Sequence, residues 1–184
     1  MKIAILGFGR EGQSVFKFIK KDKEYKNSEF FILDKNKNTK TPKNVKCYLG
    51  EDYLKNLKEF DTVFRSPGVP YNLTEIQRAI SKGVIFKSVT SLFFERAKGR
   101  IIGVTGTKGK GTTSTLLYKI LKNCGHDVYL AGNIGKPAIE ILPKLKKNSI
   151  TILELSSFQL QDLKKSPQIS LLLDIFPDHH AGGE

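Results

Sequence analysis

The sequence predicts an α/β protein in which a Rossmann-like domain is followed by a second, P-loop-type α/β domain. Three observations support this prediction. Short apolar runs typical of buried strands alternate with segments of helical spacing along the 184 residues. Two glycine-rich loops, GFGREG at 7–12 and TGTKGKGTTS at 105–114, each follow such a run and open a helical segment. The alternation restarts at residue 100, so we place the domains at 1–98 and 99–184.

The first domain is expected to contain five strands joined by helices. KIAIL is a short apolar run that ends at glycines, and FFIL is a second run that ends at Asp34. Gly99 stands where the C-terminal cap of a helix is expected. The expected strands are 2–6, 30–33, 45–48, 61–64 and 84–87, and the expected helices are 12–21, 53–58, 72–81 and 89–98.

The second domain begins with the run RIIGV, directly before the second glycine loop. Its expected strands are 100–104, 127–131, 149–155 and 168–176, and its expected helices are 112–123 and 136–145. Each glycine loop therefore lies between a strand and a helix, the setting in which backbone N–H groups bind phosphate.

The net charge of +13 favours anionic ligands but does not by itself predict a nucleic-acid-binding protein. Lysines outnumber arginines, are spread along the chain and form no stripe with aromatic residues. No apolar run is long enough to span a bilayer, and glycines interrupt MKIAIL before a signal-peptide core forms. Cys47 and Cys124 lack metal-ligand spacing and are expected to be reduced thiols. We expect a cytoplasmic protein with neither nucleic acid nor membrane as a partner.

The first glycine loop matches the pattern G-x-G-x-x-G, and Asp34 ends the next strand about 20 residues later. Its glycines permit a tight turn and close approach of the backbone to a phosphate. A carboxylate at the end of the second strand can bind a ribose or a base. The motif alone leaves three interpretations open: NAD binding, binding of a related nucleotide, and plain packing of a helix on a strand.

The second glycine loop is a shortened form of the Walker A pattern. Only two residues separate Gly106 from Gly109-Lys110, and Thr112 and Thr113 follow. The loop lies between an apolar strand and a helix, so its backbone N–H groups can surround phosphates that Lys110 reaches. This context favours a genuine phosphate-binding loop over a chance match.

Five segments extend this pattern along the chain. They are RSPGVP at 65–70, GVTGTKGKGTT at 103–113, GNIG at 132–135, ELSSFQL at 154–160 and PDHH at 177–180. In this order they resemble the Mur ligases, the family that builds the stem peptide of peptidoglycan. GNIG and ELSSFQL are most similar to the branch that adds D-glutamate to UDP-N-acetylmuramoyl-L-alanine.

The resemblance implies that the first domain binds the UDP of a nucleotide-linked substrate, not NAD, and that the second binds ATP. The first loop would face the diphosphate, and Asp34 would face the uracil. The implied substrate-binding residues are Gly7, Phe8, Gly9, Arg10, Glu11, Gly12, Asp34, Ser66, Pro67, Gly68, Asn133, Ser156 and Gln159. The implied ATP-binding residues are Gly106, Thr107, Lys108, Gly109, Lys110, Gly111, Thr112, Thr113 and Asn133.

The implied reaction is ATP-dependent amide formation through an acyl phosphate, with ATP, Mg²⁺ and D-glutamate as the other participants. Lys110, Glu154 and His179 would be the catalytic residues, and Glu154, His179 and Thr112 the metal ligands. Without the resemblance, Glu154 reads as a cap on the next turn, His179 as a surface histidine and Asn133 as a turn residue. We expect a monomer.

Three features depart from the family's pattern. Gly111 follows the lysine where many relatives carry a Ser or Thr, so Thr112 would take over the metal contact. Asp174 stands where an asparagine is usual. The family's chains are more than twice as long, so we expect a fragment, with part of the ATPase domain missing and little or no ligase activity alone. The alternative is a non-catalytic module that binds a UDP-sugar or NAD.

Overall fold

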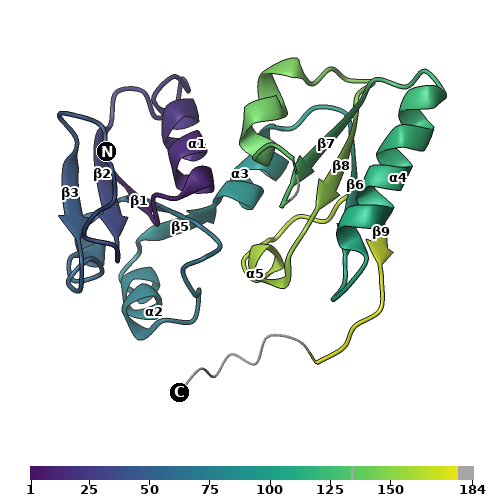
Figure 1. Ribbon diagram of the computed structural model, residues 1–184. Coiled ribbons are helices and arrows are strands. Elements are labelled where there is room, and N and C mark those ends of the chain that lie inside the picture. The colour runs from purple at the N-terminus through teal and green to yellow at the C-terminus, as the bar shows by residue number, and fades with distance from the viewer. Residues whose placement is uncertain (134, 178–184) are drawn as a thin grey trace.

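Two parallel β-sheets, one in each half of the chain, carry the two glycine loops (Figure 1). The structure is a computed structural model that describes residues 1–133 and 135–177. It confirms the predicted class, with two successive α/β units. No helix within those residues combines the length and the apolar character needed to cross a membrane.

The first sheet has the strand order β3-β2-β1-β4-β5, and all of its pairs are parallel. The chain moves outward from β1 to β2 and β3 and then returns to β4 on the other side of β1. Leu6 pairs with Arg65, so the loops after β1 and β4 begin side by side at the carboxyl edge. Open α/β sheets bind ligands at such a switch point. The elements are β1 (Lys2–Leu6), α1 (Arg10–Ile19), β2 (Glu29–Asp34), β3 (Lys46–Leu49), β4 (Thr62–Arg65), α2 (Thr74–Ser81), β5 (Ile85–Ser88) and α3 (Val89–Arg96).

The second sheet has the strand order β7-β8-β6-β9, again with parallel pairs. Val104, near the end of β6, pairs with Glu154 at the end of β8. The second glycine loop therefore starts beside the carboxylate of Glu154. The elements are β6 (Arg100–Thr105), α4 (Lys110–Asn123), β7 (Val128–Gly132), β8 (Ile150–Glu154), α5 (Ser157–Leu160) and β9 (Ile169–Leu172).

Helix α3 contributes apolar side chains to the cores of both domains. Val89 and Leu92 lie in the cluster under the first sheet, whereas Phe93 and Phe94 lie with Ile101 in the cluster of the second. Figure 1 shows α3 between the two sheets. A helix shared in this way joins the domains by burial of apolar surface and not only by the chain itself.

Two predicted helices are not α-helices. Segment 53–58 forms turns that lead into the short 3₁₀ helix η1 (Leu57–Glu59), because so short a segment has no side-chain cap to offset the cost of starting an α-helix. Segment 136–145 forms the 3₁₀ helix η2 (Ala138–Lys144). Pro143 lies inside it, and the ring of a proline clashes with the carbonyl group four residues earlier in an α-helix.

The last strand, predicted over 168–176, is also shorter and ends at Leu172. The chain leaves the sheet there and runs along the second glycine loop, where the N–H of Thr107 donates to the carbonyl oxygen of Asp174 at 2.9 Å. Helix α5, which was not predicted, is a single turn. Ser156 and Gln159 stabilise it by a reciprocal pair of side-chain to backbone hydrogen bonds.

Candidate functional site

The first glycine loop is hydrogen-bonded to Asp34, the carboxylate that was predicted to bind a ribose or a base. Asp34 Oδ2 accepts a hydrogen bond from the N–H of Phe8 at 2.6 Å, and Oδ1 accepts one from the N–H of Asn36 at 2.8 Å. Such charge-assisted bonds hold the carboxylate at the end of β2, beside the N-terminus of α1. Asp34 remains partly exposed there.

The turn after β4 is bonded to the same loop. The hydroxyl of Ser66 donates to the carbonyl oxygen of Gly7 at 2.6 Å, and the N–H of Val69 donates to Ser66 O at 3.1 Å across Pro67 and Gly68. Between this turn and the loop lies a cavity of about 820 Å³. Its lining includes Gly7, Gly9, Arg10, Glu11, Asp34, Lys35, Tyr53, Ser66, Pro67, Gly68, Val69, Pro70, Leu73 and Asn133.

The glycines of the first domain fall into two groups. A Cβ at Gly12 would lie 2.1 Å from the carbonyl oxygen of Gly7, so this glycine is required for packing of α1 against the loop. A Cβ at Gly9 or Gly68 would have no atom within 4 Å, and neither residue has a positive φ. The fold does not require glycine at these two places, and both line the cavity. They leave the backbone open to a ligand.

Lys110 lies over the second glycine loop. Its Nζ donates to the carbonyl oxygens of Gly106 at 2.7 Å and Thr107 at 3.1 Å. Gly109 precedes α4 with φ +80°, a left-handed conformation that glycine adopts at little cost. The turn directs the first N–H groups of α4 and the ammonium of Lys110 to the same place, as phosphate binding requires.

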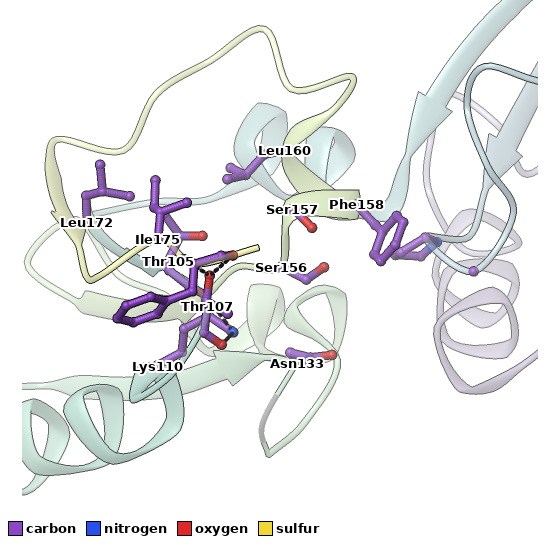
Figure 2. A pocket seen from close by; sticks show the side chains of 14 residues that line it. Thr105, Thr107, Lys110, Asn133, Ser156, Ser157, Phe158, Leu160, Leu172 and Ile175 are labelled. Atoms are coloured by element: carbon purple, nitrogen blue, oxygen red, sulfur yellow. Dashed lines mark hydrogen bonds between the residues drawn. The ribbon is translucent and has the colours of Figure 1, made fainter. Parts of the chain in front are cut away.

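The chain after β9 closes one side of this loop. The hydroxyl of Thr107 accepts from the N–H of Phe176 at 2.9 Å and donates to its carbonyl oxygen at 3.1 Å. A cavity of about 590 Å³ lies in front of the loop, and Figure 2 shows its side chains. Its lining includes Pro67, Gly68, Thr105, Gly106, Thr107, Lys110, Asn133, Ser156, Ser157, Phe158, Leu160, Leu172, Ile175 and Phe176.

Glu154 is a buried carboxylate beside this cavity. It is 3% exposed, and its Oε2 has no hydrogen-bond partner among the described residues. Burial raises the pKa of Glu154, and a hydrogen bond from the Asn133 side chain and the charge of Lys110 oppose that rise. A buried carboxylate with a free oxygen next to a phosphate loop is suited to bind a cation.

The two cavities share three residues. Pro67, Gly68 and Asn133 line both, so the two cavities adjoin at these residues. Asn133 comes from the loop after β7, and its N–H donates to the carbonyl oxygen of Glu154 at 3.2 Å. The structure therefore brings the two glycine loops to one interdomain cleft.

Gln159 connects the two domains and is almost fully buried. Its Oε1 accepts from the N–H of Ser156 at 2.9 Å, and its Nε2 donates to Glu11 Oε1 at 3.1 Å. Both ends of the amide are thus used within the protein. Burial is the largest effect on Glu11 and raises the pKa of its carboxyl, against the charges of Arg10 and Arg65 and the bond from Gln159.

Replacing Glu11 by glutamine should weaken the dependence of stability on pH. The raised pKa means that Glu11 favours folding below its ordinary value of 4.5, and this contribution is lost as the pH rises through the folded-state pKa. Glutamine cannot ionise but still presents an oxygen to Gln159. The free energy of unfolding of Glu11→Gln, from urea titrations at pH 4 to 7, should therefore fall less with rising pH than that of the parent. The exposed Glu51→Gln is the control, and curves parallel to the parent's for both variants would contradict the prediction.

Two family descriptions match the chain in sequence order. Residues 1–87 match "Mur ligase MurD-like, N-terminal domain", and residues 104–182 match "Mur ligase middle domain". The chain belongs to the Mur ligase family. The two matches leave out 88–103, which contains the whole of α3, the helix that the two cores share. The predicted boundary after residue 98 falls within this interval.

Several relatives of this Mur ligase chain share one name with each other. The UDP-N-acetylmuramoylalanine--D-glutamate ligase of Acetivibrio thermocellus is 43% identical over 135 residues, which is 73% of this chain and 29% of the relative. That of Clostridium tetani is 34% identical over 186 residues, which is 97% of this chain and 40% of the relative. The chain thus spans less than half the length of these relatives.

A solved structure has the same fold. The UDP-N-acetylmuramate:L-alanyl-gamma-D-glutamyl-meso-diaminopimelate ligase from Neisseria meningitides matches with a TM-score of 0.51 at 18% identity. The match covers 97% of this chain and 61% of that one. At this identity the likeness supports the arrangement of the two Mur ligase domains and nothing finer.

The ATP chemistry of Mur ligases implies Mg²⁺, and the residues present fit it. Mg²⁺ binds one or two carboxylates together with phosphate oxygens and water, and Glu154 supplies a buried carboxylate oxygen that lacks a partner. Within 1–133 and 135–177, no group of three or more His, Cys, Asp or Glu side chains could hold a metal ion. A site completed by nucleotide phosphates agrees with that. His179, the other predicted ligand, lies outside the described residues.

Not every predicted Mur ligase site residue lies on a cavity. Phe8 is 4% exposed and packs edge-on against Phe16, so only its backbone is available to a ligand. Among the residues predicted for ATP, those that do not line the cavity are Lys108, Gly109, Gly111, Thr112 and Thr113. These follow the loop into the first turn of α4, where they can act through backbone N–H groups or, for Thr112, an exposed hydroxyl.

The sequence analysis missed Arg65 and Asp162, which form a buried ion pair between the domains. A signal was present, because Arg65 is a charged residue at the end of the otherwise apolar run TVFR. Nothing in the sequence identified its partner. Ile175 and Phe176, which line the second cavity, were assigned to a strand that in fact ends before them.

Proposed function

We propose that this chain holds the UDP-substrate site and the ATP site of a ligase that joins D-glutamate to UDP-N-acetylmuramoyl-L-alanine. The observation that carries the proposal is the shared wall of the two cavities. A nucleotide bound at the first loop can extend its acyl end past Pro67 and Gly68 toward Lys110. That arrangement suits a ligase, in which a carboxylate must meet the γ-phosphate of ATP.

In the first cavity, the N–H groups in the first turn of α1 and the charge of Arg10 face the position of the diphosphate. Asp34, held by the N–H of Phe8, is placed to accept a hydrogen bond from the uracil or ribose. Gly9 and Gly68 leave room for the ligand against the backbone.

In the second cavity, Lys110 would exchange its bonds to Gly106 and Thr107 for bonds to the β- and γ-phosphates of ATP. Glu154 and Thr112 would hold Mg²⁺, which neutralises phosphate charge when bound. The substrate carboxylate attacks the γ-phosphorus, ADP leaves, and the amine of D-glutamate then displaces phosphate from the acyl phosphate. Ser156 and Asn133 line the path of the acyl group. Catalysis then consists of positioning and charge neutralisation.

Binding measurements test this function without requiring turnover. We expect isothermal titration calorimetry to show saturable binding of UDP-N-acetylmuramoyl-L-alanine and none of NAD at the same concentrations. Binding of NAD instead would mean that the first loop is a dinucleotide site and that the proposal is wrong.

We also propose that the protein acts as a monomer in the cytoplasm.

Replacing Gly9 by alanine should weaken binding of UDP-N-acetylmuramoyl-L-alanine about tenfold or more while leaving the fold intact. The added methyl meets no protein atom within 4 Å, but it would occupy the surface that the diphosphate approaches. Calorimetry measures the affinity, and a thermal melt checks the fold. The control is Gly83→Ala, at a turn away from both cavities where the methyl also meets no atom; the strain of alanine at φ +90° should lower its melting temperature but leave the affinity unchanged. Unchanged affinity in Gly9→Ala would show that the ligand does not approach this loop.

A further inference from the structure

Arg65 is a buried arginine at the boundary of the two domains. It ends β4, its side chain is 0% exposed, and it directly precedes the Ser66-Pro67-Gly68 turn that lines both cavities. A charged side chain buried this deeply needs partners, because burial of an unpaired charge is costly.

The guanidinium of Arg65 reaches groups of both domains. In its own domain, Nη1 donates to the carbonyl oxygen of Val69 at 2.6 Å, which closes the turn, and the Tyr71 ring centre lies 5.3 Å from Cζ. In the other domain, Nη2 lies 3.3 Å from Asp162 Oδ2 and 3.5 Å from the carbonyl oxygen of Phe158. Arg65 thus connects the turn of the first domain to α5 of the second.

The fold's stability does not explain this ion pair. Asp162 is 6% exposed at its side chain, and neither of its oxygens accepts a hydrogen bond from the described residues. Replacing a buried ion pair of incomplete geometry by apolar side chains is often neutral or stabilising. The pair instead fixes geometry. A planar guanidinium sets the relative positions of the groups it contacts, and an apolar contact does not.

A second contact crosses the boundary independently. Glu11, in the first glycine loop, accepts from Gln159, and Gln159 in turn holds the N–H of Ser156. The two connections end on the same segment, 156–162, and begin on the two loops that enclose the first cavity. Ser156 therefore has a position set by the first domain, although it lines the cavity of the second.

We propose that Arg65 and Asp162 are positioning residues that hold the segment 156–162 against the Ser66–Gly68 turn. They keep the two cavities aligned at the residues they share, Pro67, Gly68 and Asn133, so that the acyl part of the substrate reaches Lys110. This inference rests on the proposed function, since it concerns the part of the ligand beyond UDP. It assigns to the pair no contact with the ligand.

Comparison of two ligands tests the proposal. Under the proposed function, UDP occupies only the first cavity, whereas UDP-N-acetylmuramoyl-L-alanine also reaches into the second. Calorimetry on the whole 184-residue chain gives the ratio of the two affinities, which is the preference for the longer ligand. We expect Asp162→Asn to reduce this preference about fivefold or more and to leave UDP affinity within about twofold. Asp52→Asn, which removes an exposed carboxylate 3.9 Å from Lys55, should change neither value.

A double variant separates positioning from stability. Arg65→Met with Asp162→Leu removes both charges, so it should unfold in urea at or above the midpoint of Asp162→Asn. If the pair positions the second cavity relative to the first, the preference for the longer ligand should remain low in this stable variant. Recovery of the preference together with stability would overturn the proposal, as would equal loss of both affinities in Asp162→Asn. A parent chain with no preference for the longer ligand would overturn the proposed function first, and this inference with it.

Discussion

Replacing Gly12 by alanine should destabilise the first domain by about 3 kcal/mol or more. An added Cβ would lie 2.1 Å from the carbonyl oxygen of Gly7 and 3.2 Å from the hydroxyl oxygen of Ser66. The nearest atom is backbone, and both are held by other contacts, since the Ser66 hydroxyl donates to that same carbonyl. Helix α1 would have to move away from the loop, which separates Val15 and Phe16 from the core.

Urea unfolding at neutral pH measures this effect, with Gly9→Ala as the matched control. Both substitutions add one methyl to the same loop, but the methyl at Gly9 meets nothing within 4 Å. Gly9→Ala should therefore change the free energy of unfolding by no more than about 0.5 kcal/mol. If the two variants were equally stable, the close approach of α1 to Gly7 would be wrong.

The sequence predicts most of the fold because the signals that determine it are local. Each glycine loop lies directly between a strand and a helix in the chain, and parallel strands joined by helices place such loops at one edge of a sheet. The pairing of Leu6 with Arg65 then brings the turn after β4 beside the first loop. Only the family resemblance had named Ser66, Pro67 and Gly68 in advance, and the sequence analysis did not name the other lining residues Lys35, Tyr53, Val69, Pro70 and Leu73.

The errors have physical causes that the pattern does not contain. The spacing of apolar residues over 136–145 suits a helix, but Pro143 converts it to the 3₁₀ form. The run SLLLDIF reads as one strand, yet only Ile169–Leu172 pairs with β6, because Thr107 draws the following residues over the loop. The second cause is a tertiary contact that overrides local preference, whereas Pro143 is visible in the sequence itself.

The contacts between the domains could not be predicted from one sequence. Arg65 and Asp162 lie far apart in the chain, and nothing in their local sequence pairs them. Gln159 was predicted to contact the substrate, but both ends of its amide bond to protein groups. Gln159 supports Ser156 in the structure, and its contact with the substrate stays a prediction.

Replacing Lys110 by methionine should weaken ATP binding about ten- to a hundredfold and leave UDP-substrate binding unchanged. Methionine keeps most of the length and apolar stem of lysine but removes the ammonium, which lies 2.7 Å from the carbonyl oxygen of Gly106 at the centre of the loop. Hydrogen bonds to charged groups contribute about 1.5–3 kcal/mol, which corresponds to that range of affinity. Calorimetry with a non-hydrolysable ATP analogue and Mg²⁺ measures it.

Lys119→Met is the matched control, because Lys119 is exposed on the same helix and lines neither cavity. Both variants lose one positive charge, so a general effect of net charge would weaken ATP binding equally in the two. A loss confined to Lys110→Met would place the phosphates at the second loop. If UDP-substrate affinity also fell in Lys110→Met alone, the first and second loops would serve one ligand, not two. If ATP affinity did not change, the second loop would not be the phosphate site, although Glu154 could still bind a cation.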